Sequence, residues 1–364
     1  MEVGSDTMRF LFFTLLLSAA GVLGAQSRNL DIYWIDTEGG AATLIVSPSG
    51  ESMLLDTGYK DDDRDPKRIY AAAQMAGLKK IDYVVSSHFH ADHVGGLAAL
   101  SKMIPLGRFF SRSDNAIEPQ NQQWLDSLKA ASAGRRTIAK PGDEIPLKGV
   151  KTVVVSSDAK IVTRPINGGG SPNPFCADTD RKAPAQLENQ SAVGVLLTYG
   201  KFKFLNIVDL DWQMELELAC PVNRLGTVTL YQTGRHGGSD GAGSPAFLRA
   251  IQPQVVVVNN GPRKGLGNVD NTAKSILPPG TRIAPYERNL YERISKMPGV
   301  EGVWQQHLSL LDRDPAHNTS QNMIANLEDT AECNGNWIKA SVAPDGTFTV
   351  TNGRNSFSKT YTAR

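Results

Sequence analysis

Short apolar runs separated by turn residues predict β-strands in the first third of the chain. Strands are expected over residues 31–36, 42–46 and 52–55, and the Pro/Gly turn at residues 47–50 links the last two into a hairpin. The apolar run at residues 81–87 predicts a buried strand. A polar stretch follows it, and the pattern from residue 94 onwards then indicates the start of a helix.

The later part of the chain repeats this order of hairpin first and alternating strands and helices afterwards. A hairpin is predicted over residues 191–208, further strands at 151–155, 227–232, 255–258 and 303–307, and helices at 66–77, 118–131, 244–251 and 286–296. Hairpins followed by alternating elements in two similar halves predict sheets with helices outside, although no sequence repeat accompanies them. Residues 316–364 predict a small C-terminal β-hairpin extension, which leaves residues 26–315 as the main domain.

The N-terminus has the pattern of a secretory signal peptide over residues 1–25. Residues 10–17 are apolar, Arg9 precedes them, and small residues up to Gly24 and Ala25 supply a cleavage site. A membrane anchor is less well supported, because the apolar run is too short to cross a bilayer. We therefore expect a secreted or periplasmic protein with no membrane attachment after cleavage.

Composition adds two constraints. The 364 residues carry a formal net charge of +1, so electrostatic capture of nucleic acid is not expected. Three cysteines allow at most one internal disulfide. Cys176 and Cys220, both in loops flanking predicted core strands, are the expected pair, and three free thiols are the alternative.

Six consecutive residues after the strand at 81–87 carry the strongest chemical signal. His88, His90, Asp92 and His93 include three of the six histidines in the chain. A turn at the end of a strand can direct several side chains to one point, and imidazole and carboxylate groups are zinc-type ligands. An accidental cluster on a surface loop is the alternative; the pattern predicts a metal site.

This His-x-His-x-Asp-His motif, with Asp56-Thr57-Gly58 upstream, resembles that of the metallo-β-lactamase-fold hydrolase superfamily over residues 30–311. Residues 35–40 and 55–58 are most similar to the branch that contains the hydrolase domain of DNA-uptake competence channel proteins and the bacterial phosphorylcholine esterases. The resemblance implies an α/β fold, a four-layer αββα sandwich.

The resemblance also implies a set of ligands. His88 and His90 would bind a first divalent ion. Asp92, His93 and His236 would bind a second ion, and Asp209 would bridge the two. The branch usually has His-His-Gly where this chain has Arg235-His236-Gly237, and arginine cannot ligate because it stays protonated.

The third histidine that many members give the first ion is missing here, and Asn189 is the candidate donor in its place. One or two ions are therefore expected. Zinc suits these ligands first, with manganese or iron as alternatives.

Such ions hold a water molecule and lower its pKa, which makes hydroxide available near neutral pH. Asp92 would also act in catalysis, by orienting the nucleophile or relaying its proton. Asp56 would hold a ligand imidazole by a hydrogen bond, or else simply cap a strand end.

Cationic and amide side chains near the predicted site suggest an anionic small-molecule substrate. Arg235 adjoins a ligand, and Asn260, Arg263 and Lys264 follow a strand, so the four are predicted to bind substrate; solvated loop charges are the alternative for Arg263 and Lys264. His307 is either a structural histidine in an apolar strand or an unrecognised ligand. The Gly/Pro/Asn-rich stretch at residues 167–189 is either a lid or a surface insertion.

Together these features predict an exported metal-dependent hydrolase that uses metal-bound hydroxide on a phosphodiester or another phosphoester. The alternatives are a carboxylic ester, lactone or β-lactam hydrolase, and a non-catalytic metal-containing binding protein. Fold alone does not choose among them.

Overall fold

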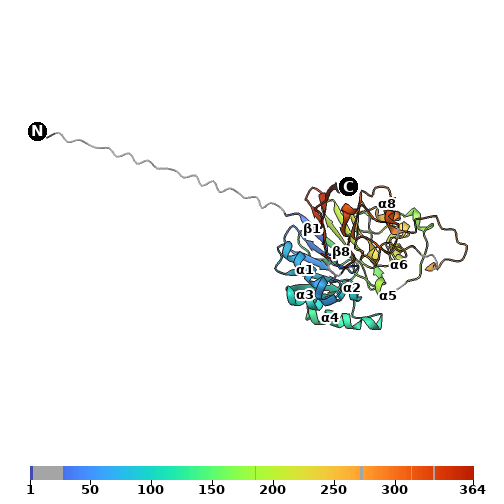
Figure 1. Ribbon diagram of the computed structural model, residues 1–364, viewed down its shortest axis with the longest axis horizontal. Coiled ribbons are helices and arrows are strands. Elements are labelled where there is room, and N and C mark those ends of the chain that lie inside the picture. The colour runs from blue at the N-terminus through green and yellow to red at the C-terminus, as the bar shows by residue number, and fades with distance from the viewer. Residues whose placement is uncertain (3–27, 185, 271–273, 313, 331–332) are drawn as a thin grey trace.

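Two mixed β-sheets packed face to face form the centre of the protein in this computed structural model (Figure 1). The structure describes residues 1–2, 28–184, 186–270, 274–312, 314–330 and 333–364. Residues 3–25 of the predicted signal peptide lie outside this set. None of the helices within the described ranges is long and apolar enough to cross a membrane.

Each sheet begins with antiparallel hairpins and continues with parallel strands. The first sheet has the order β18 (Ser358–Thr362), β17 (Thr347–Asn352), β16 (Ile338–Val342), β1 (Leu30–Trp34), β2 (Thr43–Val46), β3 (Ser52–Leu55), β4 (Ile81–Ser86), β5 (Leu106–Ser111) and β6 (Arg136–Ile138). The second has the order β15 (Ile324–Asn326), β14 (Gly302–His307), β13 (Val255–Val258), β12 (Leu230–Gln232), β11 (Phe202–Asn206), β10 (Gly194–Tyr199), β8 (Lys151–Ser157) and β7 (Glu144–Ile145), while β9 (Lys160–Ile161) pairs with β8. Strands β3 to β6 and strands β11 to β15 are parallel, so their carboxyl ends lie at one edge of each sheet.

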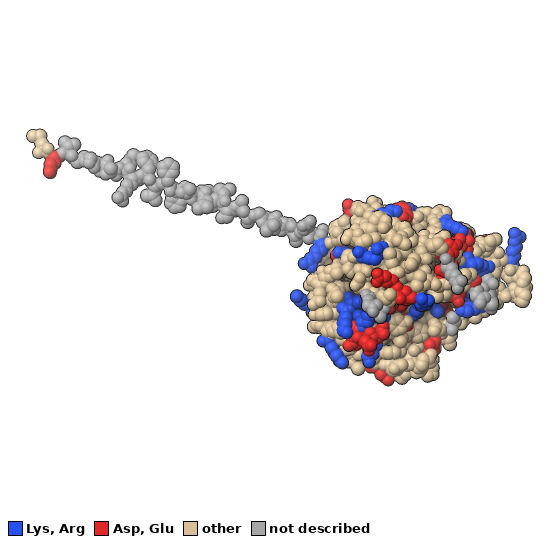
Figure 2. Space-filling model, viewed as in Figure 1, with Lys and Arg blue, Asp and Glu red and all other residues tan. Residues whose placement is uncertain are grey.

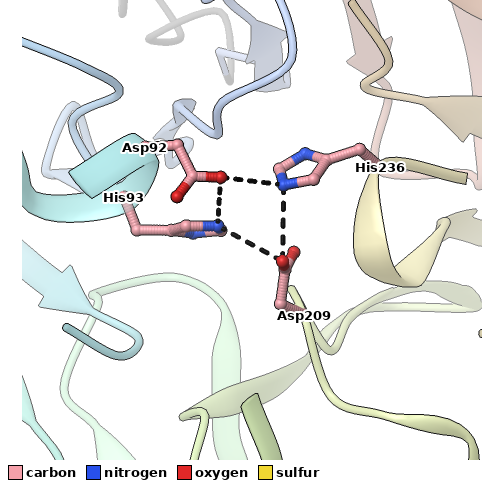
Figure 3. Close-up of side chains that lie close together, drawn as sticks. All are labelled: Asp92, His93, Asp209 and His236. Atoms are coloured by element: carbon pink, nitrogen blue, oxygen red, sulfur yellow. Dashed lines mark ion pairs between the residues drawn. The ribbon is translucent and has the colours of Figure 1, made fainter. Parts of the chain in front are cut away.

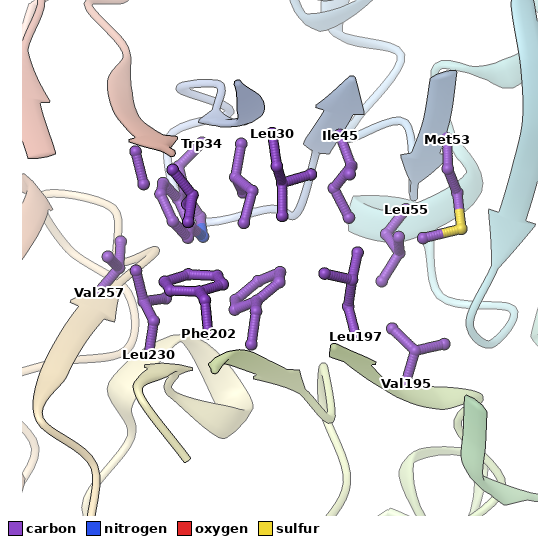
Figure 4. Packing of buried hydrophobic residues seen from close by; sticks show 14 of the residues in the cluster. Leu30, Trp34, Ile45, Met53, Leu55, Val195, Leu197, Phe202, Leu230 and Val257 are labelled. Atoms are coloured by element: carbon purple, nitrogen blue, oxygen red, sulfur yellow. The ribbon is translucent and has the colours of Figure 1, made fainter. Parts of the chain in front are cut away.

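The main hydrophobic core lies between the two sheets (Figure 4). Trp34 of the first sheet meets Phe204 of the second edge to face, with ring centroids 5.6 Å apart. Its indole nitrogen donates a hydrogen bond of 2.9 Å to the buried side chain of Gln232, so the polar atom of this large residue is also satisfied. Burial of this apolar layer fixes the position of one sheet on the other.

Helices cover the outer faces of both sheets. On the first sheet these are α1 (Arg64–Met75), α3 (Leu97–Met103) and α4 (Gln122–Ser132), and on the second α6 (Trp212–Ala219), α7 (Pro245–Ile251) and α8 (Leu290–Ser295). The two short helices α2 (Ala91–Val94) and α5 (Leu187–Gln190) lie near the metal-binding motif. This is the four-layer αββα sandwich that the sequence predicted, and the prediction is confirmed.

The last three strands extend the first sheet. Strand β16 pairs antiparallel with β1, with Leu30 opposite Val342, and β17 and β18 follow outward. Val350 and Tyr361 from these strands belong to the core between the sheets. The predicted strands of the C-terminal extension therefore pack as part of the sandwich, while the domain boundary at residue 315 remains a prediction.

The predicted Cys176–Cys220 disulfide is present in the structure, and Cys333 is a free, buried thiol. The bond fastens the stretch at residues 167–189 to the end of α6. A second attachment is Lys182, which forms a buried ion pair with Asp270. With both attachments, the middle of this stretch is held against the body of the protein, which favours the interpretation as an insertion over that of a lid.

Candidate metal centre

The predicted metal ligands leave the carboxyl ends of central strands in both sheets. The His88–His93 motif follows β4, Asp209 follows β11, and His236 follows β12. Several residues at these strand ends have positive φ although they are not glycine, namely Asp56 (60°), Val208 (51°), Arg235 (50°) and His236 (54°). Such backbone conformations are costly and persist where the surrounding structure enforces them, often at functional sites.

Four buried side chains converge on one point between the sheets: Asp92, His93, Asp209 and His236 (Figure 3). Oδ2 of Asp92 lies 3.3 Å from Nε2 of His93 and 3.2 Å from Nε2 of His236. Oδ2 of Asp209 lies 3.5 Å and 3.4 Å from the same two nitrogens. Ligands bound tetrahedrally at about 2.0–2.1 Å from a zinc ion are separated from each other by roughly 3.3 Å, so these distances fit one ion.

The hydrogen bonds of the two imidazoles also fit a metal site. Nδ1 of His93 lies 2.7 Å from the carboxylate of Asp56, and Nδ1 of His236 lies 3.1 Å from the amide of Asn259. Their Nε2 atoms are buried and have no hydrogen-bond partner among the residues that the structure describes. Because buried polar atoms are normally satisfied, two imidazole nitrogens directed at two carboxylates indicate a place for a cation.

Charge at the cluster supports the same interpretation. Burial alone would raise the pKa of Asp92 and of Asp209, but the imidazoles of His93 and His236 hold the pKa of both carboxyl groups well below the usual range. The two carboxylates are therefore ionised at neutral pH. A divalent cation would neutralise two buried negative charges that otherwise depend on protonated histidine.

His88 and His90 lie beside this cluster and face each other. Nε2 of His88 is 3.0 Å from Nδ1 of His90, and the ring centroids of His88 and His93 are 4.1 Å apart. Outward-facing nitrogens are held by Ser87 Oγ, 2.9 Å from Nδ1 of His88, and by Glu118 Oε2, 3.2 Å from Nε2 of His90. The inward nitrogens are thus the two that would bind a first ion.

Asn189, the predicted additional donor, lies in α5, a helix that contacts the loop between His88 and His90. The carboxylate of its neighbour Glu188 accepts a hydrogen bond of 3.0 Å from the backbone N–H of Phe89, between His88 and His90. Oδ1 of Asn189 is buried and has no hydrogen-bond partner within the described part of the chain. This oxygen is therefore available, and its role as a ligand stays a prediction.

Asp56 lies under the motif, where the resemblance placed it. Besides His93, its carboxylate accepts hydrogen bonds from the backbone N–H (2.8 Å) and the hydroxyl (2.7 Å) of Ser87. The side chain is 1% exposed. Asp56 therefore fixes both the loop and the orientation of a ligand ring, as the outer partners of metal ligands do.

Sequence reasoning missed the remaining supports of the motif. Arg112 is buried and makes a charge-assisted pair with Glu188, with Nη2 at 2.6 Å and 2.7 Å from its two carboxylate oxygens. Its guanidinium also lies over the ring of Phe89, 4.3 Å from the centroid. Nothing in the local pattern marks Arg112, Glu118 or Asn259, because each acts through a contact with a distant segment.

Comparison with known proteins agrees with this geometry. Residues 35–161 match the family model of the metallo-beta-lactamase superfamily. The chain contains a metallo-beta-lactamase superfamily domain.

Integrator complex subunit 11 from Gallus gallus is 36% identical over 69 residues, which are 18% of this chain and 12% of that protein. ComE operon protein 3 from Bacillus subtilis is 20% identical over 269 residues, which are 70% of this chain and 30% of that protein. A metallo-beta-lactamase from Cronobacter sakazakii has a TM-score of 0.32 at 16% identity and covers 49% of this chain and 60% of its own. The chain thus matches less than a third of the length of either curated relative.

A cavity of about 410 Å³ opens over the candidate metal centre of this superfamily domain. Arg235 and Lys264 line it, together with Asp92, Asp209 and His236. The ammonium of Lys264 contacts the carboxylate of Asp92. Partial burial would lower the pKa of Lys264, but Asp92 outweighs that effect and raises it, so the side chain is a fixed positive charge at the centre.

The structure does not bring the other two predicted substrate-binding residues into this cavity. The amide of Asn260 is buried and donates hydrogen bonds to the backbone carbonyl groups of Gly261 (3.0 Å) and His307 (2.8 Å). Arg263 is exposed and pairs with Asp329 at 2.7 Å. Asn260 and Arg263 follow the same strand as Lys264. Each side chain is held away from the cavity by a partner that the sequence pattern does not reveal.

A second buried group of potential ligands contains His307, Asp36 and Cys333. Nε2 of His307 lies 2.6 Å from Oδ1 of Asp36, and the guanidinium of Arg68 lies 2.9 Å from Oδ2 of the same residue. Direct hydrogen bonding and an adjacent cation leave little reason for an ion to bind there. We therefore interpret His307 as a structural histidine whose Nε2 is satisfied by Asp36, although its buried Nδ1 has no hydrogen-bond partner among the described residues.

Proposed function

We propose that the chain is an exported, metal-dependent hydrolase whose substrate is a small anionic phosphodiester or another phosphoester. The observation that carries this proposal is the spacing of four converging side chains, Asp92, His93, Asp209 and His236. Oδ2 of each carboxylate lies 3.2–3.5 Å from the Nε2 atoms of the two histidines. Metal-ligating residues arranged in this way in a metallo-beta-lactamase domain support hydrolysis.

A divalent ion bound here supplies a Lewis acid and lowers the pKa of a coordinated water. Asp92 lines the cavity and would orient the attacking nucleophile or relay its proton. Lys264 and Arg235 would hold the negative charge of the substrate, since both line the same cavity. Two cations beside the reacting group favour a phosphoester over an uncharged ester.

Zinc is the ion that we propose first, with manganese or iron as alternatives, because the donors are imidazole and carboxylate groups without a thiolate. The Asp92–His93–Asp209–His236 cluster would hold one ion. The other ion, at His88 and His90, would share Asp209 with it. That ion would need a further donor, for which Asn189 is the candidate.

Export is proposed from the signal-peptide pattern of residues 1–25. The Cys176–Cys220 disulfide supports it, because such bonds persist mainly in oxidising compartments. N-terminal sequencing of the protein recovered outside the cytoplasm should give a start close to Ala25. Recovery of an intact N-terminus from the cytoplasm alone would contradict export.

Metal content and substrate preference test the enzymatic proposal. Metal-loaded protein should hydrolyse bis-p-nitrophenyl phosphate in preference to nitrocefin and p-nitrophenyl acetate. His236→Gln should lower kcat/KM by at least about 100-fold, more than the loss of an outer partner of a ligand typically does. His317→Gln is the matched control, because His317 pairs with Asp312 and lies outside the cavity.

The outcomes separate the alternatives. A preference for nitrocefin or the acetate ester would contradict the phosphoester assignment and leave the hydrolase in place. A fully metallated sample that turns over none of the three would contradict the enzymatic proposal and favour a binding protein.

A further inference from the structure

A second cavity adjoins the metal centre. It has a volume of about 550 Å³ and is lined by Tyr59, Trp124 and Pro262 together with Ala91 and Lys264, the last two of which also line the cavity over the metal ligands. The two cavities therefore meet at Ala91 and Lys264. We call the second one the ring cavity.

Of the other charged side chains that line the ring cavity, Glu38, Asp61, Arg64 and Arg263 have partners, and Lys60 is exposed. Arg64 pairs with Glu38 at 2.9 Å, and Arg263 pairs with Asp329 at 2.7 Å. Besides Lys60 and Lys264, what the cavity offers to a ligand is therefore mainly two aromatic rings and a proline. Aromatic rings bind other flat rings by offset stacking or edge-to-face contact, which adds to the effect of apolar burial.

Both aromatic side chains are held in place. Trp124 lies near the start of α4 and packs against the apolar cluster on the outer face of the first sheet. The hydroxyl of Tyr59 accepts a hydrogen bond of 3.0 Å from Lys264 Nζ. Rings that are fixed before a ligand arrives lose little conformational entropy on binding.

Lys264 connects the two cavities electrostatically. Its ammonium contacts Asp92 on one side and Tyr59 on the other, and it lies 5.3 Å from the centroid of the tyrosine ring. A phosphoryl group at the metal centre would lie beside this positive charge, and a substituent attached to it would extend over Ala91 toward Trp124.

We propose that the ring cavity binds a flat aromatic substituent of the substrate while the phosphoester lies at the metal centre. This inference rests on the proposed function, and it makes the substrate class more specific: a phosphoester that carries an aryl group. Trp124 and Tyr59 are its specificity-determining residues.

Binding of phosphonates, which cannot be hydrolysed at the phosphorus–carbon bond, tests the inference without turnover. Zinc-loaded protein is titrated calorimetrically with phenylphosphonate, cyclohexylphosphonate and methylphosphonate. Phenylphosphonate should bind about 10-fold more tightly than methylphosphonate, as expected for a ring that gains about 1.4 kcal/mol from burial and stacking. Cyclohexylphosphonate, similar in size but not flat, should fall between them.

Variants locate the preference. Trp124→Leu should bring the phenyl-to-methyl ratio to within about 3-fold and leave methylphosphonate affinity unchanged, since only the ring contact is lost. Trp124→Phe keeps a ring at the same place and should retain most of the preference. Trp337→Leu is the matched control, because Trp337 is also half-buried but lines neither cavity.

The proposed role of the ring cavity would be overturned if the phenyl preference survived Trp124→Leu. It would also be overturned if the native protein bound methylphosphonate but showed no phenyl preference. Both results would leave the proposed hydrolase function intact. Failure of all three phosphonates to bind the zinc-loaded protein would count against both. Equal loss of preference in Trp337→Leu would also overturn the assignment.

Discussion

Asp56→Asn is the substitution that most directly probes how the fold prepares the metal centre. The carboxylate of Asp56 is 1% exposed and receives three hydrogen bonds of 2.7–2.8 Å, two from Ser87 and one involving Nδ1 of His93. With Nδ1–H donating to Asp56, the lone pair of His93 lies on Nε2, which faces the metal site. Asparagine has a similar shape and tolerates the positive φ of this position, so the change is chiefly one of charge and acceptor number.

The expected effects follow from this geometry. The backbone N–H of Ser87 bonds to Oδ1 of Asp56, whereas the Ser87 hydroxyl and Nδ1 of His93 both bond to Oδ2. A single asparagine oxygen cannot replace both carboxylate oxygens, so at least one buried donor is left unpaired, at a cost of about 1–3 kcal/mol in unfolding free energy. If the amide N–H₂ faces His93, the ring proton moves to Nε2 and blocks ligation. Loss of such an outer partner weakens metal binding by about 10–100-fold, or roughly 1.4–2.7 kcal/mol.

Metal affinity is measured by competition with a chromophoric chelator, and stability by urea unfolding of the metal-free protein. Asp36→Asn is the matched control, because Asp36 is equally buried and also pairs with a histidine, His307, at 2.6 Å. This control should lose stability but keep its affinity for the metal. Unchanged affinity in Asp56→Asn, or an equal loss in Asp36→Asn, would refute the reasoning.

Three further predictions concern stability. Burial raises the pKa of Glu215 to about 7, so the neutral carboxyl group is favoured in the folded state. The contribution of Glu215 to the free energy of unfolding is therefore full below its ordinary pKa of 4.5, and about 3 kcal/mol of it is lost as pH rises through 7. Urea unfolding at pH 5 and pH 8 should show this loss in the native protein and not in Glu215→Gln, and parallel pH profiles would contradict it. Arg112→Met leaves the carboxylate of Glu188 buried without its partner, so unfolding free energy at pH 7 should fall by about 3–5 kcal/mol, and a fall below 1 kcal/mol would be inconsistent with the ion pair. The Cys176–Cys220 bond closes a separation of 44 residues, which corresponds to about 4 kcal/mol of unfolding free energy. Cys176→Ser and added reductant should therefore lower Tm by similar amounts, and an unchanged Tm in both would argue against the bond.

The sandwich was predictable because its central strands are continuous apolar runs that end in polar turns. The segment Val255–Val258 is one example, and the run at residues 81–87 appears as β4. Strands β5, β6, β7, β9 and β15 and helices α5 and α6 escaped prediction. In β5, Gly107 and Arg108 interrupt the apolar pattern, and pairing with neighbouring strands determines the structure of such short segments.

Helix ends and loop side chains were harder to predict for a related reason. Asp65 has the residue type of a helix cap, but α1 begins at Arg64, and the carboxylate of Asp65 instead accepts a hydrogen bond of 2.7 Å from the N–H of Tyr59. The residues of the metal motif could be identified because they are contiguous in sequence. The directions of Asn260 and Arg263 depend on partners in other segments, and no local pattern encodes those partners.

The cluster of Asp92, His93, Asp209 and His236 takes two members from the half of the chain that forms the first sheet and two from the half that forms the second. A bound ion would thus link the two halves of the chain, and it could bind with all four ligands only after both halves have folded and packed together. Metal supply would then affect the stability of the protein as well as its activity, because a ligand that binds only the folded state stabilises that state. Resistance of the purified protein to proteolysis should therefore rise and fall with the concentration of free divalent metal ions.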